Sequence, residues 1–297
     1  MPDLIIEFLT AGSKTGLELK KIWKKPLLII MDSPLREQFE DMYGKTFASG
    51  KKIDYLERLS LESADNIICY SETMRRFITE KYKIKAGLNV MPCIIHKKQL
   101  DIYERTGRVN ETPLIGFVGS FLSWHKVDLL IRAFNEIHAE FPNARLALIG
   151  YGAEWERIKK MVFDFQMEDY VEMPGFVNEQ KLEWYKSKMT IGVMPGSNWY
   201  GSPLKLFEYA QSSIAMIAPE SPVVKDLFTK EEALFIDDNN SLESLVQNIR
   251  LLLTDNELRT NLVSHAFKKM QGSFSKENQG SIFNKIVKKT LEDGIKE

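Results

Sequence analysis

The stretch Leu114–Glu140, LIGFVGSFLSWHKVDLLIRAFNEIHAE, joins a short apolar run to an amphipathic segment through a loop that begins with glycine. The run Leu114–Val118 predicts a buried strand, and the apolar spacing over Val127–Glu140 predicts a helix. Strand and helix in this order form the repeating unit of proteins in which helices cover both faces of a parallel sheet. This stretch therefore predicts an α/β fold.

The same alternation extends in both directions along the chain. Upstream, we expect strands at Leu4–Phe8, Pro26–Met31, Asn66–Tyr70 and Asn89–Met91. Downstream, we expect strands at Arg145–Ile149, Tyr170–Met173, Thr190–Met194, Ile214–Ala218 and Leu234–Ile236. Helices are expected between them, the clearest at Ile53–Ser63 and Thr73–Lys81, with more helix at Leu242–Leu253 and from Asn256 onward.

The chain of 297 residues is long enough for two domains. Between Ile94 and Thr112 the sequence is polar and aperiodic, which is typical of a linker. We therefore predict one domain over residues 1–107, a second over 108–275, and a C-terminal helix over 276–297 that packs back toward the first.

Composition excludes several classes of protein. Forty basic and forty-one acidic residues give a net charge of −1, so no overall field attracts nucleic acid, and any anionic ligand must be held locally. Two cysteines, Cys69 and Cys93, are too few for a disulfide framework and lack the spacing of a metal site. The N-terminus has no basic and apolar leader pattern, so we expect a cytoplasmic protein.

Glycine recurs at or beyond the ends of the strands expected between residues 114 and 194. In doubly wound sheets a ligand binds outside the carboxyl ends of the strands, where glycine lets the backbone approach it closely. The residues in question are Gly119, Gly150, Gly152, Gly175, Gly196 and Gly201. A dinucleotide fingerprint at GYGAEW is not supported, because its third glycine position is Trp155.

The stretch Gly201–Gln211, GSPLKLFEYAQ, predicts a helix that begins beside this edge. Ser202 is suited to the N-cap and Pro203 to the first helical position. Lys205 and Glu208 then share one helix face. A lysine in the first turn opposes the helix dipole unless an anion lies nearby, so either an anion site or a simple intrahelical ion pair explains these two residues.

With these motifs in place, the chain resembles the retaining nucleotide-sugar glycosyltransferases of family 4. The resemblance rests on GSPLKLFEYA and covers nearly the whole chain, including IGFVGSFLSWHKVDLLIRAF, ARLALIGYGAEWERIKK, VEMPGFVNEQKLEWYKSKMTIGVMP and PLLIIMDSPLRE. It implies the GT-B fold, in which two Rossmann-like domains bind the acceptor and the nucleotide-sugar donor. It further implies a hexosyltransferase that takes a UDP- or GDP-sugar, needs no cofactor or metal, and acts on a glycan or lipid-linked acceptor in cell-surface polysaccharide synthesis.

The resemblance also implies roles for individual residues. Glu208 would hold the donor ribose, and Lys205 would lie near the diphosphate together with His125, so these three are the catalytic candidates. The segment Gly175–Val177 would meet the nucleobase. The donor-binding candidates are Gly119, Ser120, Lys126, Gly150, Gly152, Phe176, Val177, Tyr200, Gly201, Ser202, Pro203 and Leu204.

Several positions depart from the family pattern. Tyr200 stands where the first of two acids is usual, and Ser120 and His125 replace an arginine and a lysine, although His125 is also explained as a surface histidine. The expected glycine-loop unit does not precede Pro2, so we expect an N-terminal domain that lacks its first βα units. These departures leave two alternatives, a donor-binding remnant without turnover and a GT-B sugar-nucleotide epimerase. An epimerase needs acid and base groups around the sugar, and the chain has four histidines.

The C-terminal sequence KENQGSIFNKIVKKTLEDGIKE is rich in lysine. It predicts either a solvated helix that packs back across the domains or a peripheral contact with the inner face of an anionic membrane. Glutamates interrupt the basic face, which favours the solvated helix.

Overall fold

The computed structural model describes residues 2–44, 50–94, 112–237 and 241–294. It divides into two compact units. Unit 1 comprises residues 1–93, 200–202 and 275–297, and unit 2 comprises residues 94–199 and 203–274. The predicted boundary at 107/108 and most of the predicted linker lie outside the described residues.

Unit 1 is built on a parallel sheet that, within the described ranges, has four strands in the order β1-β2-β3-β4. The strands are β1 (Ile5–Phe8), β2 (Leu27–Met31), β3 (Asn66–Cys69) and β4 (Gly87–Val90). Their connections are α1 (Thr15–Trp23), α2 (Leu35–Tyr43), α3 (Gly50–Ser63) and α4 (Glu72–Tyr82). Both β2 and β3 are buried at every position, as expected for strands covered on both faces.

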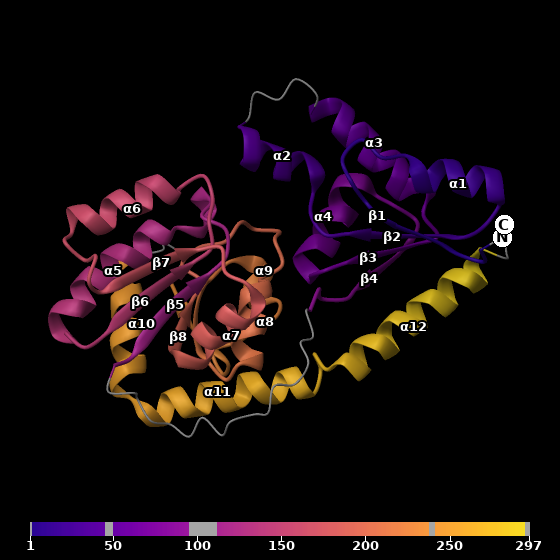
Figure 1. The fold of residues 1–297 in the computed structure, drawn as a ribbon. Coiled ribbons are helices and arrows are strands. Elements are labelled where there is room, and N and C mark those ends of the chain that lie inside the picture. Colours follow the sequence, from indigo (N-terminus) through magenta and orange to yellow (C-terminus); the bar gives the residue numbers. More distant parts are fainter. Residues whose placement is uncertain (1, 45–49, 95–111, 238–240, 295–297) are drawn as a thin grey trace. The chain divides into compact units, whose positions relative to one another are not determined.

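The helix α12 (Lys276–Asp293) belongs to unit 1, although it lies at the far end of the sequence. Its Ile286 side chain joins a buried cluster with Leu28 and Ile30 of β2 and Ile68 of β3. Asn66 also donates a hydrogen bond to Asp293, at 3.2 Å. The apolar face of this lysine-rich helix therefore covers the unit 1 sheet (Figure 1), and its lysines are exposed.

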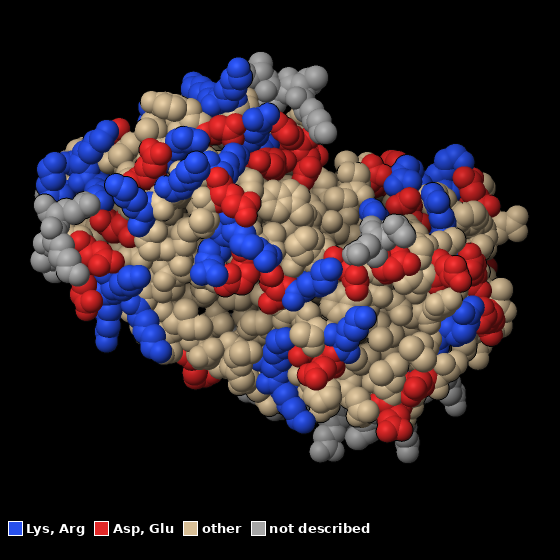
Figure 2. Space-filling view, turned by 180° about the vertical axis from the view of Figure 1, so that it is seen from behind, with Lys and Arg blue, Asp and Glu red and all other residues tan. Residues whose placement is uncertain are grey.

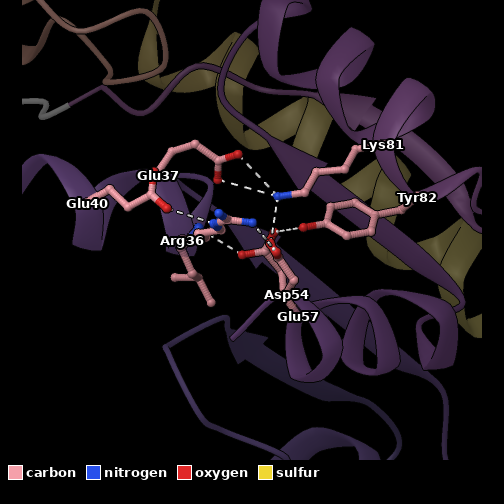
Figure 3. A network of polar contacts seen from close by, with 8 residues as sticks. Arg36, Glu37, Glu40, Asp54, Glu57, Lys81 and Tyr82 are labelled. Carbon is pink, nitrogen blue, oxygen red and sulfur yellow. Dashed lines mark hydrogen bonds and ion pairs between the residues drawn. The ribbon is translucent and has the colours of Figure 1, made fainter. Parts of the chain in front are cut away.

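The helices α2, α3 and α4 are joined by a network of charges (Figure 3). Glu57 on α3 is 1% exposed, and its carboxylate accepts hydrogen bonds from the Tyr82 hydroxyl and, at 2.8 Å, from the backbone N–H of Leu35. Burial raises the pKa of Glu57. Nearby, Asp54 pairs with Arg36 at 2.8 Å and with Lys81 at 2.9 Å. The buried carboxylate thus fixes the start of α2, which follows directly after β2.

Replacing Tyr82 with phenylalanine is expected to lower the free energy of unfolding by about 1–3 kcal/mol, because a buried carboxylate would lose one of its donors. Urea denaturation followed by circular dichroism measures this difference. Tyr55→Phe is the matched control, since Tyr55 lies on the same helix as Glu57 but is 59% exposed. Equal stability of the two variants would contradict the structural role assigned to the Tyr82–Glu57 hydrogen bond.

Unit 2 is built on a parallel sheet that, within the described ranges, has six strands in the order β10-β9-β8-β5-β6-β7. The strands are β5 (Leu114–Val118), β6 (Arg145–Ile149), β7 (Val171–Gly175), β8 (Met189–Val193), β9 (Ala215–Pro219) and β10 (Ala233–Ile236). The chain proceeds outward from β5 to β7 and then returns to the other side of β5. The neighbouring strands β5 and β8 therefore form a topological switch point, where doubly wound sheets bind ligands.

Helices cover both faces of the unit 2 sheet (Figure 1). One core contains side chains of α5 (Val127–Glu140), α6 (Trp155–Asp164) and α10 (Leu242–Thr254). The core on the other face contains side chains of α7 (Glu179–Lys188), α8 (Leu204–Gln211), α9 (Pro222–Lys225) and α11 (Asn256–Gln271). Alternate residues of β6 enter the two cores, with Leu146 and Leu148 in the first and Ala147 and Ile149 in the second.

Each predicted strand is confirmed to within two residues at either end. The helical region expected from Asn256 onward consists of two helices, α11 and α12. The first ends before Gly272, whose backbone leaves the helical region, and the second starts after Ser275. The Ser275 hydroxyl accepts a hydrogen bond from the backbone N–H of Asn278, at 3.2 Å, which is an N-cap.

Basic and acidic side chains are interspersed over the face drawn in Figure 2, as the net charge of −1 leads one to expect. Among the described residues, the helices are too short or too polar for any of them to cross a bilayer.

Candidate functional site

Three glycines form a row at the carboxyl ends of β5, β6 and β7. Gly119, Gly150 and Gly175 all have positive φ, at 148°, 128° and 71°. The Gly119 N–H donates to the carbonyl of Ile149, at 2.9 Å, and the Gly150 N–H donates to the carbonyl of Gly175, at 3.0 Å. An added Cβ on Gly150 would lie 1.9 Å from the Gly119 carbonyl oxygen. Glycine is required here because the backbones of neighbouring loops approach each other directly.

The loop after β6 is equally tight against the loop after β5. A Cβ on Gly152 would lie 2.6 Å from the carbonyl oxygen of Phe121. In addition, the N–H of Phe121 donates to the carbonyl of Tyr151, at 3.1 Å. Gly152 therefore fixes the two loops against each other.

The helix α8 is fixed under this row by Tyr209. Its hydroxyl accepts a hydrogen bond from the backbone N–H of Val118, at 3.0 Å, at the end of β5. Its ring lies against β8, where a Cβ on Gly192 would come within 2.6 Å of the ring. Lys205 lies one turn earlier on the same face as Tyr209. Tyr209 thus sets the position of Lys205 relative to the end of β5.

Lys205 places an ammonium group beneath Gly119. The Nζ atom is buried and, among the residues that the structure describes, has no hydrogen-bond partner. An added Cβ on Gly119 would lie 3.1 Å from Nζ, and Nζ also lies 4.6 Å from the centroid of the Phe117 ring. Burial lowers the pKa of Lys205 to about 7, partly opposed by the charge of Glu208. A buried cation without a partner, at a switch point, is suited to an anionic ligand.

Glu208 contacts a lysine of another helix. Its Oε2 lies 3.4 Å from Nζ of Lys186 on α7. The alternative of an intrahelical ion pair between Lys205 and Glu208 is therefore wrong, because the Lys205 ammonium has no hydrogen-bond partner within the described ranges. The two side chains share a helix face, but no hydrogen bond joins them among the described residues.

His125 lies in the 3₁₀ turn Ser123–His125 after β5. Its Nδ1 is 2.6 Å from the carbonyl oxygen of Ser120. A carbonyl can only accept, so Nδ1 carries the proton and Nε2 of the neutral ring is an acceptor. Burial and the nearby Lys205 charge lower the pKa of His125 to about 4. The ring is therefore neutral near pH 7, and its Nε2 is suited to accept a hydrogen bond from a hydroxyl.

A group of aromatic side chains lies at the ends of β6 and β7. Phe176 is 82% exposed and its ring centroid is 6.4 Å from that of Tyr151. Tyr151 in turn lies 5.1 Å from Trp155, which contacts Phe121 at 5.3 Å. Val177, next along the chain, packs instead against the core beneath α7 and α8. An exposed ring of this kind at a strand end offers a flat apolar surface to a ligand.

The start of α8 differs from the prediction. The helix begins at Leu204 with Pro203 at the N-cap, and the Ser202 hydroxyl caps nothing. That hydroxyl is buried and without a hydrogen-bond partner among the described residues. Proline at the N-cap has no side-chain oxygen, so the first amide groups of the helix are not capped by a side chain.

The remaining predicted residues lie in two places. Residues 200–202 group with unit 1, where the Tyr200 hydroxyl donates to Asp41 at 2.7 Å. Lys126 has positive φ, at 49°, and forms the N-cap of α5. The sequence interpretation missed Lys186 and Tyr209, which hold Glu208 and α8 in position. A buried lysine and a tyrosine inside helices give no motif, although the Gly192 opposite Tyr209 is a signal for close packing.

The family "Glycosyl transferases group 1" matches residues 99–269, more than half of the chain. The chain belongs to this family. An uncharacterized glycosyltransferase of Haemophilus influenzae is 24% identical over 78% of the chain. The chain spans 64% of that relative, less than two thirds of its length.

Solved structures have the same fold. WaaG, a glycosyltransferase involved in lipopolysaccharide biosynthesis, aligns with a TM-score of 0.68 at 12% identity, over 91% of the chain and 79% of WaaG. Anabaena HepE, solved in complex with UDP and glucose, aligns with a TM-score of 0.72 at 13% identity, over 96% of the chain and 77% of HepE. The predicted α/β class with parallel sheets and the GT-B fold are confirmed.

Proposed function

We propose that this group 1 glycosyltransferase is a retaining enzyme of family 4, which transfers a sugar from UDP or GDP to a hydroxyl of a glycan or lipid-linked acceptor in cell-surface polysaccharide synthesis. The observation that carries the proposal is the buried Lys205 ammonium, without a hydrogen-bond partner in the described ranges, beneath the glycine row at the switch point. It is supported by the family match and by a structure of similar fold that holds UDP and glucose.

The proposed chemistry places the charge of the leaving group beside Lys205. The bond between the sugar C1 and the β-phosphate oxygen breaks, and negative charge develops on the diphosphate. The Lys205 ammonium and the uncapped amides at the start of α8 stabilise that charge. The acceptor oxygen bonds to C1 on the same face, and its proton passes to the leaving phosphate. This route needs no metal or cofactor, because the charge is compensated by protein groups.

Other residues of the site take roles in binding the donor. Glu208 accepts hydrogen bonds from the ribose hydroxyls, and the exposed Phe176 ring covers one side of the nucleobase. The neutral His125 accepts a hydrogen bond from a hydroxyl of the donor sugar through Nε2. Together, the loops after β5, β6 and β7 offer backbone N–H groups and apolar surface to the same ligand.

Calorimetric titration with UDP and with GDP tests the proposal. We expect one of them to bind, with a Kd in a range of about 1 µM to 1 mM, which is typical of enzyme substrates. Glu208→Gln is expected to weaken binding by about 10- to 100-fold, because hydrogen bonds to a charged acceptor are lost. Glu156→Gln, an exposed carboxylate on α6, is the control. Failure of both nucleotides to bind, or equal binding by Glu208→Gln, would overturn the site assignment.

An assay of sugar transfer distinguishes a glycosyltransferase from the alternative, a protein that binds the donor without turnover. The nucleotide that binds is supplied as its glucose conjugate, and release of free nucleotide is measured with and without a glycan acceptor. Release that depends on the protein and is lost in Lys205→Met supports a transferase. Tight nucleotide binding without any release would support the remnant.

A further inference from the structure

Lys186 on α7 is a buried lysine, with a side chain 2% exposed. Lysine is almost never buried to this degree unless it is paired. Its Nζ lies 2.6 Å from Oε1 of Glu183 and 3.4 Å from Oε2 of Glu208. It therefore joins two carboxylates from different helices.

Lys186 does not need to be buried in order to neutralise the charge of Glu183. Glu183 lies three residues before Lys186 on the same helix and is 21% exposed, so an ordinary surface pair was available to it. Removing an ammonium from water is costly, and the second carboxylate, Glu208, comes from α8. The buried position thus serves the contact between α7 and α8.

The position of Lys186 is fixed by its neighbours. Tyr185 is buried, and its hydroxyl donates to Glu172 on β7, at 2.9 Å. At the other end of α7, the Asn178 side chain accepts a hydrogen bond from the N–H of Lys181, at 2.9 Å, which caps the helix. Because α7 is held at both ends and the Lys186 side chain is 2% exposed, the ammonium has little freedom to follow a moving carboxylate.

We propose that Lys186 is a positioning residue, which holds the Glu208 carboxylate in the orientation that accepts hydrogen bonds from two adjacent hydroxyls of the donor ribose. This inference rests on the proposed function, in which Glu208 meets the ribose. The Lys186 ammonium anchors Oε2 and so fixes the plane of the carboxylate.

The test compares UDP or GDP, whichever binds, with its 2′,3′-dideoxy form. In the wild type, loss of both hydroxyls is expected to weaken binding by about 10- to 100-fold, since the contacts with Glu208 are lost. Lys186→Met is expected to bind the ribonucleotide about tenfold more weakly and the dideoxy form with unchanged affinity. Lys188→Met, an exposed lysine on the same helix, should keep the wild-type ratio.

The outcomes separate the inference from the proposed function. The measured quantity is the affinity for the ribonucleotide divided by the affinity for the dideoxynucleotide. If this ratio is unchanged in Lys186→Met but falls to about one in Glu208→Gln, the role of Lys186 alone is overturned. A ratio near one already in the wild type would overturn the ribose role of Glu208 as well. The double variant Lys186→Met/Glu208→Gln should be no weaker than Glu208→Gln, because both changes remove the same contact.

A second variant covers the case in which Lys186→Met fails to fold. Glu183→Gln/Lys186→Met removes the carboxylate of α7 together with the ammonium, so Glu183 is not left as a charge without its counter-ion. Its ratio of ribonucleotide to dideoxynucleotide affinity should also fall toward one. A wild-type ratio in this variant contradicts the inference.

Discussion

Lys205→Met is expected to lower sugar transfer by about 10²- to 10³-fold and, at the same time, to stabilise the folded protein. The loss follows because the group that compensates charge on the leaving diphosphate would be gone, and removal of a single preorganised donor has effects of about this size. Methionine is close to lysine in length and fits the apolar contact with Phe117, 4.6 Å from Nζ. Turnover with the accepted donor measures the loss.

The gain in stability follows from the lowered pKa of Lys205, about 7 against an ordinary value of 10.5. Between these two pH values the unfolded chain binds more protons at this residue than the folded chain, so folding is penalised below pH 10.5 and most strongly below 7. Lys205→Met removes the penalty and should raise the free energy of unfolding by about 2–4 kcal/mol at pH 7. The difference should shrink as the pH approaches 10.5.

The same residue predicts a pH dependence of nucleotide binding. The diphosphate binds the protonated ammonium, so affinity of the wild type should fall as the pH rises through about 7 to 9, while the affinity of Lys205→Met stays flat. Calorimetry across this range checks both curves. Lys159→Met, an exposed lysine on α6, should follow the wild type in stability and in pH profile. A variant at 205 that is inactive and also less stable would contradict the assignment of a buried, functional ammonium.

The sequence predicts the strands well because each one is a short apolar run with a turn signal at its end. For example, β6 is apolar at four of its five positions, and Gly150 follows it. The apolar run indicates a buried strand, and the glycine marks its end. The place of Lys205 in the first turn of a helix was also predictable from GSPLKLFEYAQ, while its role at an anion site stays a prediction. Local chemistry of this kind needs no knowledge of the tertiary contacts.

Contacts between distant segments could not be predicted in the same way. Glu208 pairs with Lys186, which lies 22 residues earlier on another helix, and the nearer Lys205 does not take its place. The protonation of His125 depends on burial and on the Ser120 carbonyl, neither of which has a sequence signal. The start of α8 was placed one residue early because Ser202 and Pro203 match a capping pattern that the packing of this loop overrides.

Gly150→Ala is expected to have the largest effect on folding among substitutions in the glycine row. Gly150 has φ of 128°, which alanine rarely adopts, and the new Cβ would lie 1.9 Å from the Gly119 carbonyl oxygen. The obstacle is backbone rather than a flexible side chain, so the loop after β5 must move. We expect the free energy of unfolding to fall by about 3 kcal/mol or more.

Gly280→Ala is the matched control with an opposite expected sign. Gly280 lies in α12, with no atom within 4 Å of an added Cβ, so alanine there should stabilise the helix by about 0.5–1 kcal/mol. Where the Gly150→Ala protein remains folded at low temperature, its affinity for the nucleotide should also drop. A Cβ built on Gly119 would lie 3.1 Å from the Lys205 ammonium, so displacement of Gly119 alters the space above this group. Thermal unfolding by circular dichroism and calorimetric titration measure the two effects. Wild-type stability in Gly150→Ala would show that the close approach of these two loops is not required for the fold.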